Sequence, residues 1–318
     1  MWHNIMIRTL QLVTTRRPFF EQQVAALERH GVDCHVVTVP KPPSGARSLR
    51  DYVRFYGRVL RESLDGPYDL VHANYGLTAP AAIAQPTRPI VLSLWGSDVW
   101  GKYGYVSDWC SREFDAVIVM SEQMADTLDT QSVVIPHGID LNLFEPHPQT
   151  EARAELGWND QQYHVLFPYS PSREVKDYPR AVRVVEKAQE RLGKPVTLQT
   201  VSGEPHERIP VYMSAADAML LTSHWEGSPN AVKEALACNL PVVSTDVGDV
   251  RSYLTERSGS HVGRSDDELV TALCDVLERD GRPNSRETMV EFGLDQMAEN
   301  IVSVYERVLE PKREVTAS

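Results

Sequence analysis

Short apolar runs alternate with longer amphipathic stretches along this chain of 318 residues. Each apolar run predicts a buried strand, and the stretch after it has apolar residues at helical spacing. Strands that alternate with helices are typical of a doubly wound parallel sheet, and the length is sufficient for two such α/β domains. The expected strands are 4–13, 36–39, 70–72, 90–94, 116–119 and 133–135, and then 165–168, 196–201, 218–221 and 241–245.

A polar stretch with two prolines, residues 145–150, separates the two series of strands. Its composition is that of an interdomain linker. We therefore expect an N-terminal domain at 1–147 and a second domain at 148–292. Residues 293–318 are expected to form a final helix, apolar at core-facing spacing up to about residue 309, followed by a tail.

The stretch with the most candidate ligand-binding residues lies between strands 218–221 and 241–245. Ser228 is a good N-cap and Pro229 suits a first helical position, so a helix is expected from there to Cys238. Glu226 then lies on the preceding loop and Glu234 lies inside the helix. A helix start after a parallel strand is a common seat for phosphate, and carboxylates accept hydrogen bonds from hydroxyls. A nucleotide-sugar contains both groups.

The whole segment 226–248 resembles the E-x7-E signature of retaining nucleotide-sugar glycosyltransferases of family 4. This resemblance implies the GT-B fold, with two Rossmann-like domains facing across a cleft and a C-terminal helix crossing back to the first domain. It implies that Glu226 contacts the transferred sugar as the catalytic carboxylate and that Glu234 holds ribose hydroxyls. The other donor-binding residues that it implies are Arg173 and Lys176 for the diphosphate, with Gly227, Ser228, Pro229 and Asn230 at the helix start.

The acceptor side is expected in the first domain, on loops that follow strands. The segment 95–98 resembles the family's His-Gly-x-Asp, with Trp95 in place of the histidine and Asp98 matching. Asp98 is therefore a second catalytic candidate, one that would hold an acceptor hydroxyl. Trp95 either stacks on a sugar ring or packs in the core, and both interpretations remain open. The remaining acceptor-binding candidates are Tyr75 and, on a first loop that has no glycine, Arg16 and Arg17.

Residues 41–62 are basic within an acidic chain, with six basic side chains against two acidic ones. Within this region, residues 48–64 predict an amphipathic helix that carries Arg50, Arg54, Arg58 and Arg61 at helical spacing. Such a helix either lies on an anionic membrane or packs as an ordinary surface helix, and the sequence leaves both interpretations open.

Composition excludes several classes. A net charge of −12 argues against nucleic-acid binding. No membrane span or signal peptide is recognisable, so the expected location is the cytoplasm, with or without peripheral contact at the inner face of the membrane. The four cysteines lie far apart, and no Asp-x-Asp pair is well placed, so neither a zinc site nor a metal cofactor is expected.

The function predicted from these features is transfer of a hexose from a nucleotide-diphosphate sugar to a hydroxyl of a lipid-linked glycan, a polysaccharide or a small molecule. One alternative is a non-catalytic partner subunit that binds the nucleotide-sugar. Another is a nucleotide-sugar epimerase on the same fold, although no general acid/base pair is evident. A nicotinamide dehydrogenase is disfavoured because no G-x-G-x-x-G follows an early strand.

Overall fold

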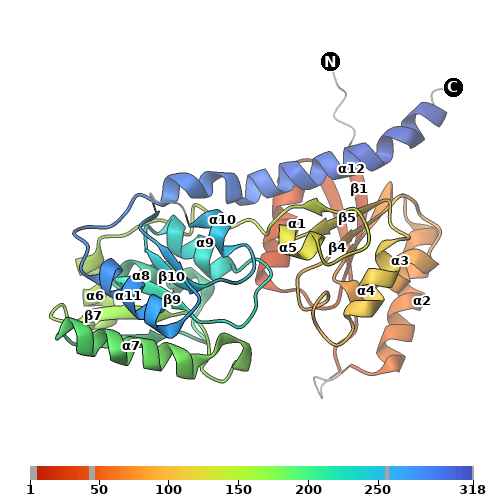
Figure 1. Ribbon diagram of the computed structural model, residues 1–318. Coiled ribbons are helices and arrows are strands. Elements are labelled where there is room, and N and C mark those ends of the chain that lie inside the picture. The colour runs from red at the N-terminus through yellow and green to blue at the C-terminus, as the bar shows by residue number, and fades with distance from the viewer. Residues whose placement is uncertain (1–5, 43–46, 255–257, 317–318) are drawn as a thin grey trace. The chain divides into compact units, whose positions relative to one another are not determined.

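The computed structural model describes residues 6–42, 47–254 and 258–316, with side chains described as far as Glu310. The chain forms two compact units, 1–138 together with 294–318, and 139–293 (Figure 1). The second unit begins nine residues earlier than the sequence indicated, because Ile139 and Phe144 are buried in its core. The expected linker also contains the start of a helix, α6 (Gln149–Leu156).

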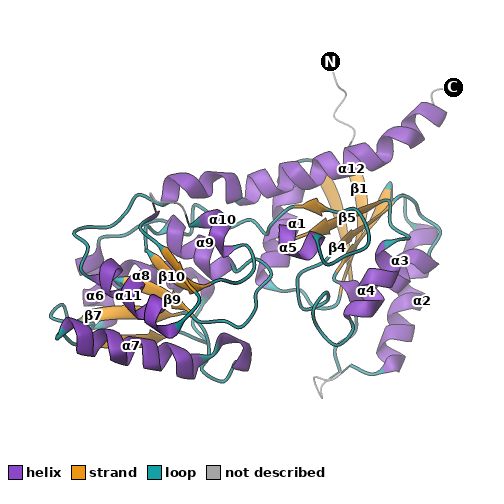
Figure 2. Cartoon of the chain, in the orientation of Figure 1, coloured by secondary structure: helices purple, strands orange, loops and turns teal. Residues whose placement is uncertain are grey.

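The first unit is built on a six-stranded sheet in the order β2-β1-β3-β4-β5-β6, and all its pairings are parallel (Figure 2). Helices on both faces bury such a sheet, which explains why its strands read as continuous apolar runs. Residues 4 and 5 of the expected first strand lie outside the described residues. The strands are β1 (Ile7–Val13), β2 (Val32–Thr38), β3 (Leu70–Asn74), β4 (Ile90–Ser93), β5 (Ala116–Val119) and β6 (Val133–Val134).

The last helix of the chain, α12, belongs to this first unit. It packs against α1 and contributes Leu294, Met297, Ile301 and Tyr305 to the core. It continues to Thr316, so the tail expected after residue 309 is helical at least that far. None of the described helices is long and apolar enough to cross a membrane. The helices are α1 (Pro18–Arg29), α2 (Leu49–Asp65), α3 (Ala79–Ala84), α4 (Gly104–Ser111), α5 (Glu122–Ala125) and α12 (Leu294–Thr316), with the 3₁₀ turn η1 (Gly76–Thr78).

The second unit is built on a five-stranded parallel sheet in the order β11-β10-β9-β7-β8. Its strands are β7 (Tyr163–Phe167), β8 (Val196–Thr200), β9 (Ala218–Leu221), β10 (Val242–Thr245) and β11 (His261–Gly263). Its helices besides α6 are α7 (Tyr178–Leu192), α8 (Ile209–Ala215), α9 (Asn230–Ala237), α10 (Val250–Tyr253) and α11 (Asp266–Leu277). It also contains the 3₁₀ segments η2 (Glu174–Lys176), η3 (His206–Arg208) and η5 (Arg286–Phe292).

In each sheet the first and third strands of the unit are neighbours, β1 with β3 and β7 with β9. The strand order reverses at these pairs, which makes them the topological switch points of the two sheets. Ligands of doubly wound sheets bind at this point. The fold therefore directs attention to the loops after β7 and β9, and to those after β1 and β3.

Candidate active site

The loops after β7 and β9 meet through an ion pair between Lys176 and Glu226. Lys176 is 3% exposed, and its ammonium nitrogen lies 3.8 Å from the centroid of the Tyr169 ring. The same Glu226 oxygen accepts a hydrogen bond of 2.6 Å from the Ser223 hydroxyl. Burial lowers the pKa of Lys176, and the neighbouring Glu226 carboxylate opposes that shift. The predicted diphosphate cation and the predicted catalytic carboxylate are thus direct partners.

Backbone contacts hold these two loops in register. The Thr222 hydroxyl lies 2.8 Å from the carbonyl oxygen of Lys176 and 3.0 Å from that of Asp177. The backbone N–H of His224 donates to the carbonyl of Val175 at 2.9 Å. Arg173 is exposed, and its guanidinium lies 5.7 Å from the centroid of the Tyr169 ring. Arg173 and Lys176 therefore share one tyrosine, the first at the surface and the second buried.

The helix of the motif begins one residue later than predicted. Asn230 is its first residue, and Pro229 is the N-cap without a side-chain cap. The Ser228 hydroxyl does not cap the helix, because it accepts a 3.1 Å hydrogen bond from the Lys233 ammonium group and bonds the Tyr253 hydroxyl at 2.8 Å. The Ser228 side chain is thereby committed to the interior, and its contribution to donor binding would come from its backbone.

The buried partners of Ser228 were not foreseen from the sequence. Lys233 is fully buried, and burial lowers its pKa to about 8 although Asp249 acts in the opposite direction. The Tyr253 hydroxyl donates to Asp249, whose pKa is raised by burial. Asp249 stands where family 4 glycosyltransferases often have a second glycine. This difference was the one feature of the sequence that could have drawn attention to Asp249. Lysine in a helix is ordinarily a surface residue, so nothing distinguished Lys233.

Glu234, the expected ribose-binding residue, has a histidine beside it. The Nε2 atom of His206 lies 3.3 Å from a carboxylate oxygen of Glu234, and this hydrogen bond raises the pKa of His206. His206 lies on η3, on the connection that follows β8, and its ring meets that of Phe144 edge-on at 5.2 Å. A position after the carboxyl end of a parallel strand favours a side chain that faces a ligand, although His206 was not among the residues expected at the site.

Gly248 allows the loop after β10 to approach the loop that carries Glu226. Its φ is +55°, and a Cβ atom added there would lie 2.6 Å from the carbonyl oxygen of Gly227 and 2.9 Å from that of Glu226. Only glycine fits both the left-handed conformation and the close contact. Gly248 thus packs directly against the backbone of Glu226 and Gly227.

Asp98, the second catalytic candidate, is 3% exposed in the first unit. One carboxylate oxygen accepts the backbone N–H groups of Trp95 at 2.8 Å and Gly96 at 2.9 Å, and the other accepts that of Gly76 at 3.0 Å. Burial raises its pKa to about 6 in spite of these donors. A catalytic role stays a prediction, while the geometry favours a positioning role that joins the loops after β3 and β4.

Trp95 packs against aromatic rings, which is one of the two interpretations left open by the sequence. Its ring meets that of Phe19 edge-on at 4.8 Å and lies 5.8 Å from that of His137. Its indole nitrogen is buried without a hydrogen-bond partner among the described residues. Tyr75 adjoins the same ring at 5.7 Å and has a φ of 93°. The acceptor candidates Tyr75 and Trp95 are thus brought together.

The two arginines of the first loop are at the surface. Arg16 is half-exposed and pairs with Glu21 at 3.5 Å, and Arg17 is exposed at the N-cap of α1. Neither contacts Trp95 in the hydrogen bonds and ring contacts of the described residues. Their assignment to the acceptor stays a prediction.

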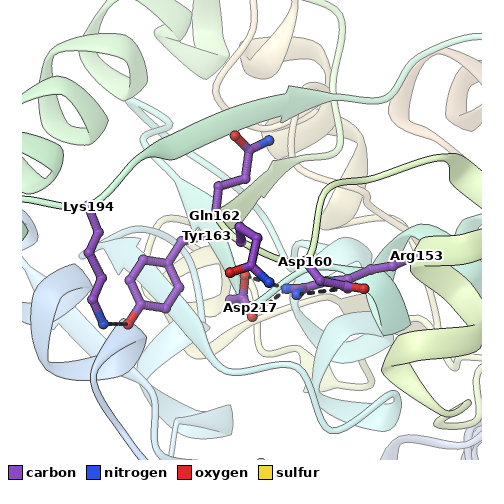
Figure 3. A pocket seen from close by; sticks show the side chains of 7 residues that line it. Arg153, Asp160, Gln162, Tyr163, Lys194 and Asp217 are labelled. Atoms are coloured by element: carbon purple, nitrogen blue, oxygen red, sulfur yellow. Dashed lines mark hydrogen bonds and ion pairs between the residues drawn. The ribbon is translucent and has the colours of Figure 1, made fainter.

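A separate pocket of 310 Å³ lies at the other end of the second sheet, where Tyr163 begins β7 and Asp217 precedes β9 (Figure 3). The Arg153 guanidinium pairs with Asp217 at 2.7 Å, and Lys194 lies 3.5 Å from the Tyr163 hydroxyl. Arg153 thus has carboxylate partners in this pocket, whereas the contact of Lys194 is with a neutral hydroxyl. The described residues contain no group of three or more His, Cys, Asp or Glu side chains that could hold a metal ion.

Two parallel-sheet α/β units with an E-x7-E segment at the switch point of the second define the GT-B class of glycosyltransferases. Comparison with protein families agrees: the profile for glycosyl transferases group 1 matches residues 150–295, and that for glycosyltransferase family 4 matches residues 9–143. The chain belongs to the GT-B glycosyltransferases of the family 4 type.

Among curated proteins, the chain is similar to a putative teichuronic acid biosynthesis glycosyltransferase, TuaC, of Bacillus subtilis, with 32% identity over 58% of this chain and 54% of the relative. It is also similar to the lipopolysaccharide core biosynthesis mannosyltransferase LpsB of Rhizobium meliloti, with 28% identity over 64% of this chain and 68% of the relative. The chain thus spans about half of the first relative and two thirds of the second.

Among solved structures, sucrose-phosphate synthase from Thermosynechococcus elongatus superposes with a TM-score of 0.71 at 17% identity, covering 96% of this chain and all of that one. HepE of Anabaena, in complex with UDP and glucose, gives a TM-score of 0.71 at 18% identity over 95% of this chain and all of that one. At these identities the superpositions establish the fold.

Proposed function

We propose that this protein is a retaining glycosyltransferase that moves a hexose from a nucleotide-diphosphate sugar to a hydroxyl acceptor. The observation that carries the proposal is the contact of Lys176 with Glu226 at the β7/β9 switch point. A cation for the diphosphate and a carboxylate for the sugar are needed side by side, because the bond that breaks joins these two parts of the donor.

In the proposed reaction the cationic groups of Arg173 and Lys176 take the negative charge that develops on the departing diphosphate. Stabilisation of charge where it develops is ordinarily the largest contribution to such catalysis, since the sugar acquires oxocarbenium character as the leaving group departs. Two cations beside the diphosphate would make a metal ion unnecessary. Glu226 would be released from Lys176 by the diphosphate and would accept hydrogen bonds from the sugar hydroxyls.

The nucleoside end of the donor is proposed to lie at Glu234. Its carboxylate would accept hydrogen bonds from the vicinal ribose hydroxyls, and one of its oxygens is already held by His206. The backbone from Gly227 to Asn230 would complete the donor seat. The UDP and glucose named in the HepE structure support a uridine nucleotide as the first donor to test.

The acceptor is proposed to be a glycan or a lipid-linked glycan, bound by the first unit near Tyr75 and Trp95. The relatives named for teichuronic acid and for lipopolysaccharide core biosynthesis support this class of acceptor. The protein is proposed to act in the cytoplasm, with peripheral contact at the inner face of the membrane through residues 48–64.

A second candidate function is a non-catalytic subunit that binds the nucleotide-sugar. The observation in its favour is Trp95, which fills with a packed indole the position where the family often has a histidine near the transferred sugar. Nucleotide binding alone therefore does not decide between the two functions.

The first experiment is thermal stabilisation by UDP, GDP, ADP, CMP and NAD, each with and without magnesium. A ligand at about 100 times its dissociation constant should stabilise the native state by about 2.7 kcal/mol. A response to one nucleoside diphosphate that is lost in Lys176→Met is the expected result, and a response to NAD alone would contradict the proposal. Formation of a glycosylated product distinguishes the enzyme from the non-catalytic subunit. NMR of the product then shows whether the anomeric configuration is retained.

A further inference from the structure

Four polar side chains beside the start of α9 form one hydrogen-bonded network, the Lys233 network, which consists of Lys233, Ser228, Tyr253 and Asp249. The Lys233 ammonium group donates to the Ser228 hydroxyl at 3.1 Å, and this hydroxyl bonds that of Tyr253 at 2.8 Å. Tyr253 in turn donates to Asp249. Lys233 and Tyr253 are buried, whereas Ser228 and Asp249 are partly buried. The network thus joins the loop after β9 to the loop after β10.

The two ends of the network fix the direction of its hydrogen bonds. An ammonium group only donates, and an ionised carboxylate only accepts. The hydroxyl hydrogen of Tyr253 is directed at Asp249, so Tyr253 receives Ser228 as a donor. A side-chain hydrogen bond from Ser228 also acts to lower the pKa of Asp249. The Ser228 hydrogen is therefore used inside the network, whichever of the two neighbours accepts it.

A hydroxyl that is held in this way also restrains its own backbone. Ser228 lies two residues before Asn230, the first residue of α9. The N–H groups at a helix start can bind phosphate only where they point towards it. Pro229 has no backbone N–H, so a phosphate at this helix start depends on those of Ser228 and Asn230. The orientation of Ser228 is thus decisive for the proposed diphosphate seat.

Stability does not explain why a lysine is buried here. Removal of an ammonium group from water is costly, and apolar side chains of similar volume often replace buried charges without loss of stability. The neighbouring positions of α9 that are buried, Val232, Ala235 and Leu236, are all apolar. Burial lowers the pKa of Lys233, although Asp249 and Glu234 act in the opposite direction. Groups perturbed in this way gather at functional sites, which favours a role at the donor site.

The network also reaches both carboxylates of the E-x7-E segment. Asp249 follows Gly248, where a Cβ atom would lie 2.6 Å from the carbonyl oxygen of Gly227 and 2.9 Å from that of Glu226. Lys233 precedes Glu234 in α9 and interacts with it electrostatically. A change in the network would therefore be felt along the whole proposed donor seat.

We propose that Lys233 is a positioning residue for the diphosphate of the donor. Its ammonium group holds the Ser228 hydroxyl from the protein interior, and the backbone N–H groups of Ser228 and Asn230 are thereby aligned for the phosphate oxygens. Lys233 is fully buried and acts through Ser228. The inference rests on the proposed function, because it requires a nucleoside diphosphate at the start of α9.

The test compares the affinity for UDP with the affinity for uridine in NMR titrations. Lys233→Met should weaken UDP binding about tenfold, the effect of about one hydrogen bond to a charged group. Uridine binding should change by less than about twofold, because uridine has no phosphate to align. Equal losses for UDP and uridine would indicate general loosening of the site and would overturn the proposal. GDP with guanosine, or ADP with adenosine, takes the place of this pair if the wild type responds to that base instead.

Ser228→Ala should reproduce the effect of Lys233→Met, because both variants break the same connection. The variant that combines the two changes should bind UDP no more weakly than either alone, since residues in one network are not additive. The phosphorus chemical shifts of bound UDP should move in both single variants. Normal UDP affinity in Ser228→Ala would contradict the proposed route from Lys233 to the backbone.

A second double variant separates positioning from neutralisation of charge. Lys233→Met/Asp249→Asn removes both charges, so the fold is not left with a partly buried carboxylate that has lost this cation. It should still bind UDP weakly, because Lys233 no longer donates to Ser228. If UDP affinity returns to that of the wild type, Lys233 serves only to neutralise Asp249 and the proposal is wrong.

Matched controls come from the same unit. Ser285 is fully buried, and its hydroxyl donates to the carbonyl of Leu236 at 2.8 Å, near the other end of α9. Lys187 is an exposed lysine of α7. Ser285→Ala and Lys187→Met should both keep the wild-type affinity for UDP. A loss in Ser285→Ala as large as that in Ser228→Ala would show that any buried serine beside α9 has the same effect.

The wild type distinguishes failure of this inference from failure of the proposed function. If the wild type binds UDP and all the variants bind it equally well, the role of Lys233 is removed and the glycosyltransferase proposal stands. If the wild type binds none of the nucleoside diphosphates, both are removed.

Discussion

Lys176 and Glu226, fifty positions apart in sequence, form an ion pair at the reversal point of the second sheet, with their side chains 4% and 13% exposed. The pair joins the loop after β7 to the loop after β9, so it is a structural contact as well as a chemical one. Each of the two charges is thus the partner of the other, and the donor is proposed to separate them.

The energetic coupling of this pair can be measured by a double-mutant cycle. Lys176→Met should lower the free energy of unfolding by about 3 kcal/mol, because it leaves a largely buried carboxylate without its cation. The coupling energy with Glu226→Gln should be of the order of 1–3 kcal/mol. The exposed pair of Lys187 and Asp267, 3.4 Å apart, is the control and should couple by less than about 1 kcal/mol. Equal coupling in the two cycles would contradict this account.

Gly248→Ala should displace the loop that carries Glu226. The matched control is Gly193→Ala, because Gly193 has a similar φ of +62° and a Cβ atom there would meet nothing within 4 Å. Both variants lose about 1 kcal/mol to backbone strain, but only Gly248→Ala should weaken nucleotide binding in thermal-shift titrations. If both variants bind nucleotide equally well, Gly248 has no role in supporting the site.

The pair of His206 and Glu234 makes a contribution to stability that depends on pH. The pKa of His206 is raised above the model-peptide value of 6.5, first by its hydrogen bond to Glu234. The stabilisation is therefore fully present below about pH 6.5 and is lost as the pH rises through the raised pKa. Glu234→Gln should return the NMR-measured pKa of His206 towards 6.5 and should weaken nucleotide binding. An unchanged His206 pKa would rule out the contact.

Lys233 contributes a pH dependence of the opposite sign. Its folded pKa of about 8 lies below the unfolded value of 10.5, so the unfolded state holds the extra proton between these values. The free energy of unfolding of the wild type should therefore rise relative to Lys233→Met from about pH 8 to about pH 10.5, by up to about 3 kcal/mol. Lys194→Met, at an exposed position, should run parallel to the wild type. Parallel curves for Lys233→Met would show that Lys233 is solvated.

Local pattern was sufficient for ten of the eleven described strands and for the E-x7-E segment. It did not predict β11 (His261–Gly263), and it placed the start of β2 at residue 36 where the strand begins at Val32. Val117, Ile118 and Val119 form a buried run that no surface element would contain. Local pattern failed where a side chain bonds a residue that is distant in sequence. Serine at position 228 is a residue type that favours an N-cap, but its hydroxyl bonds that of Tyr253, 25 residues further along the chain.

The polar core of the first unit could not be predicted from the sequence for the same reason. The Tyr305 hydroxyl lies 2.6 Å from Nδ1 of His72 across 233 positions, and Gln11 donates to the same hydroxyl at 3.1 Å. Each residue alone reads as an ordinary strand or helix position. Burial lowers the pKa of His72 to about 3, so it is neutral, a state that follows from its enclosure and not from its neighbours in sequence.

The place of α12 in the first unit determines the order in which the chain can fold during synthesis. The second unit is one continuous segment, 139–293, and it can close as soon as that segment has left the ribosome. The first unit is translated earlier, yet its core lacks Met297, Ile301 and Tyr305 until the end of the chain emerges. The part that is made first is therefore completed last, and meanwhile its open face is what a chaperone would encounter.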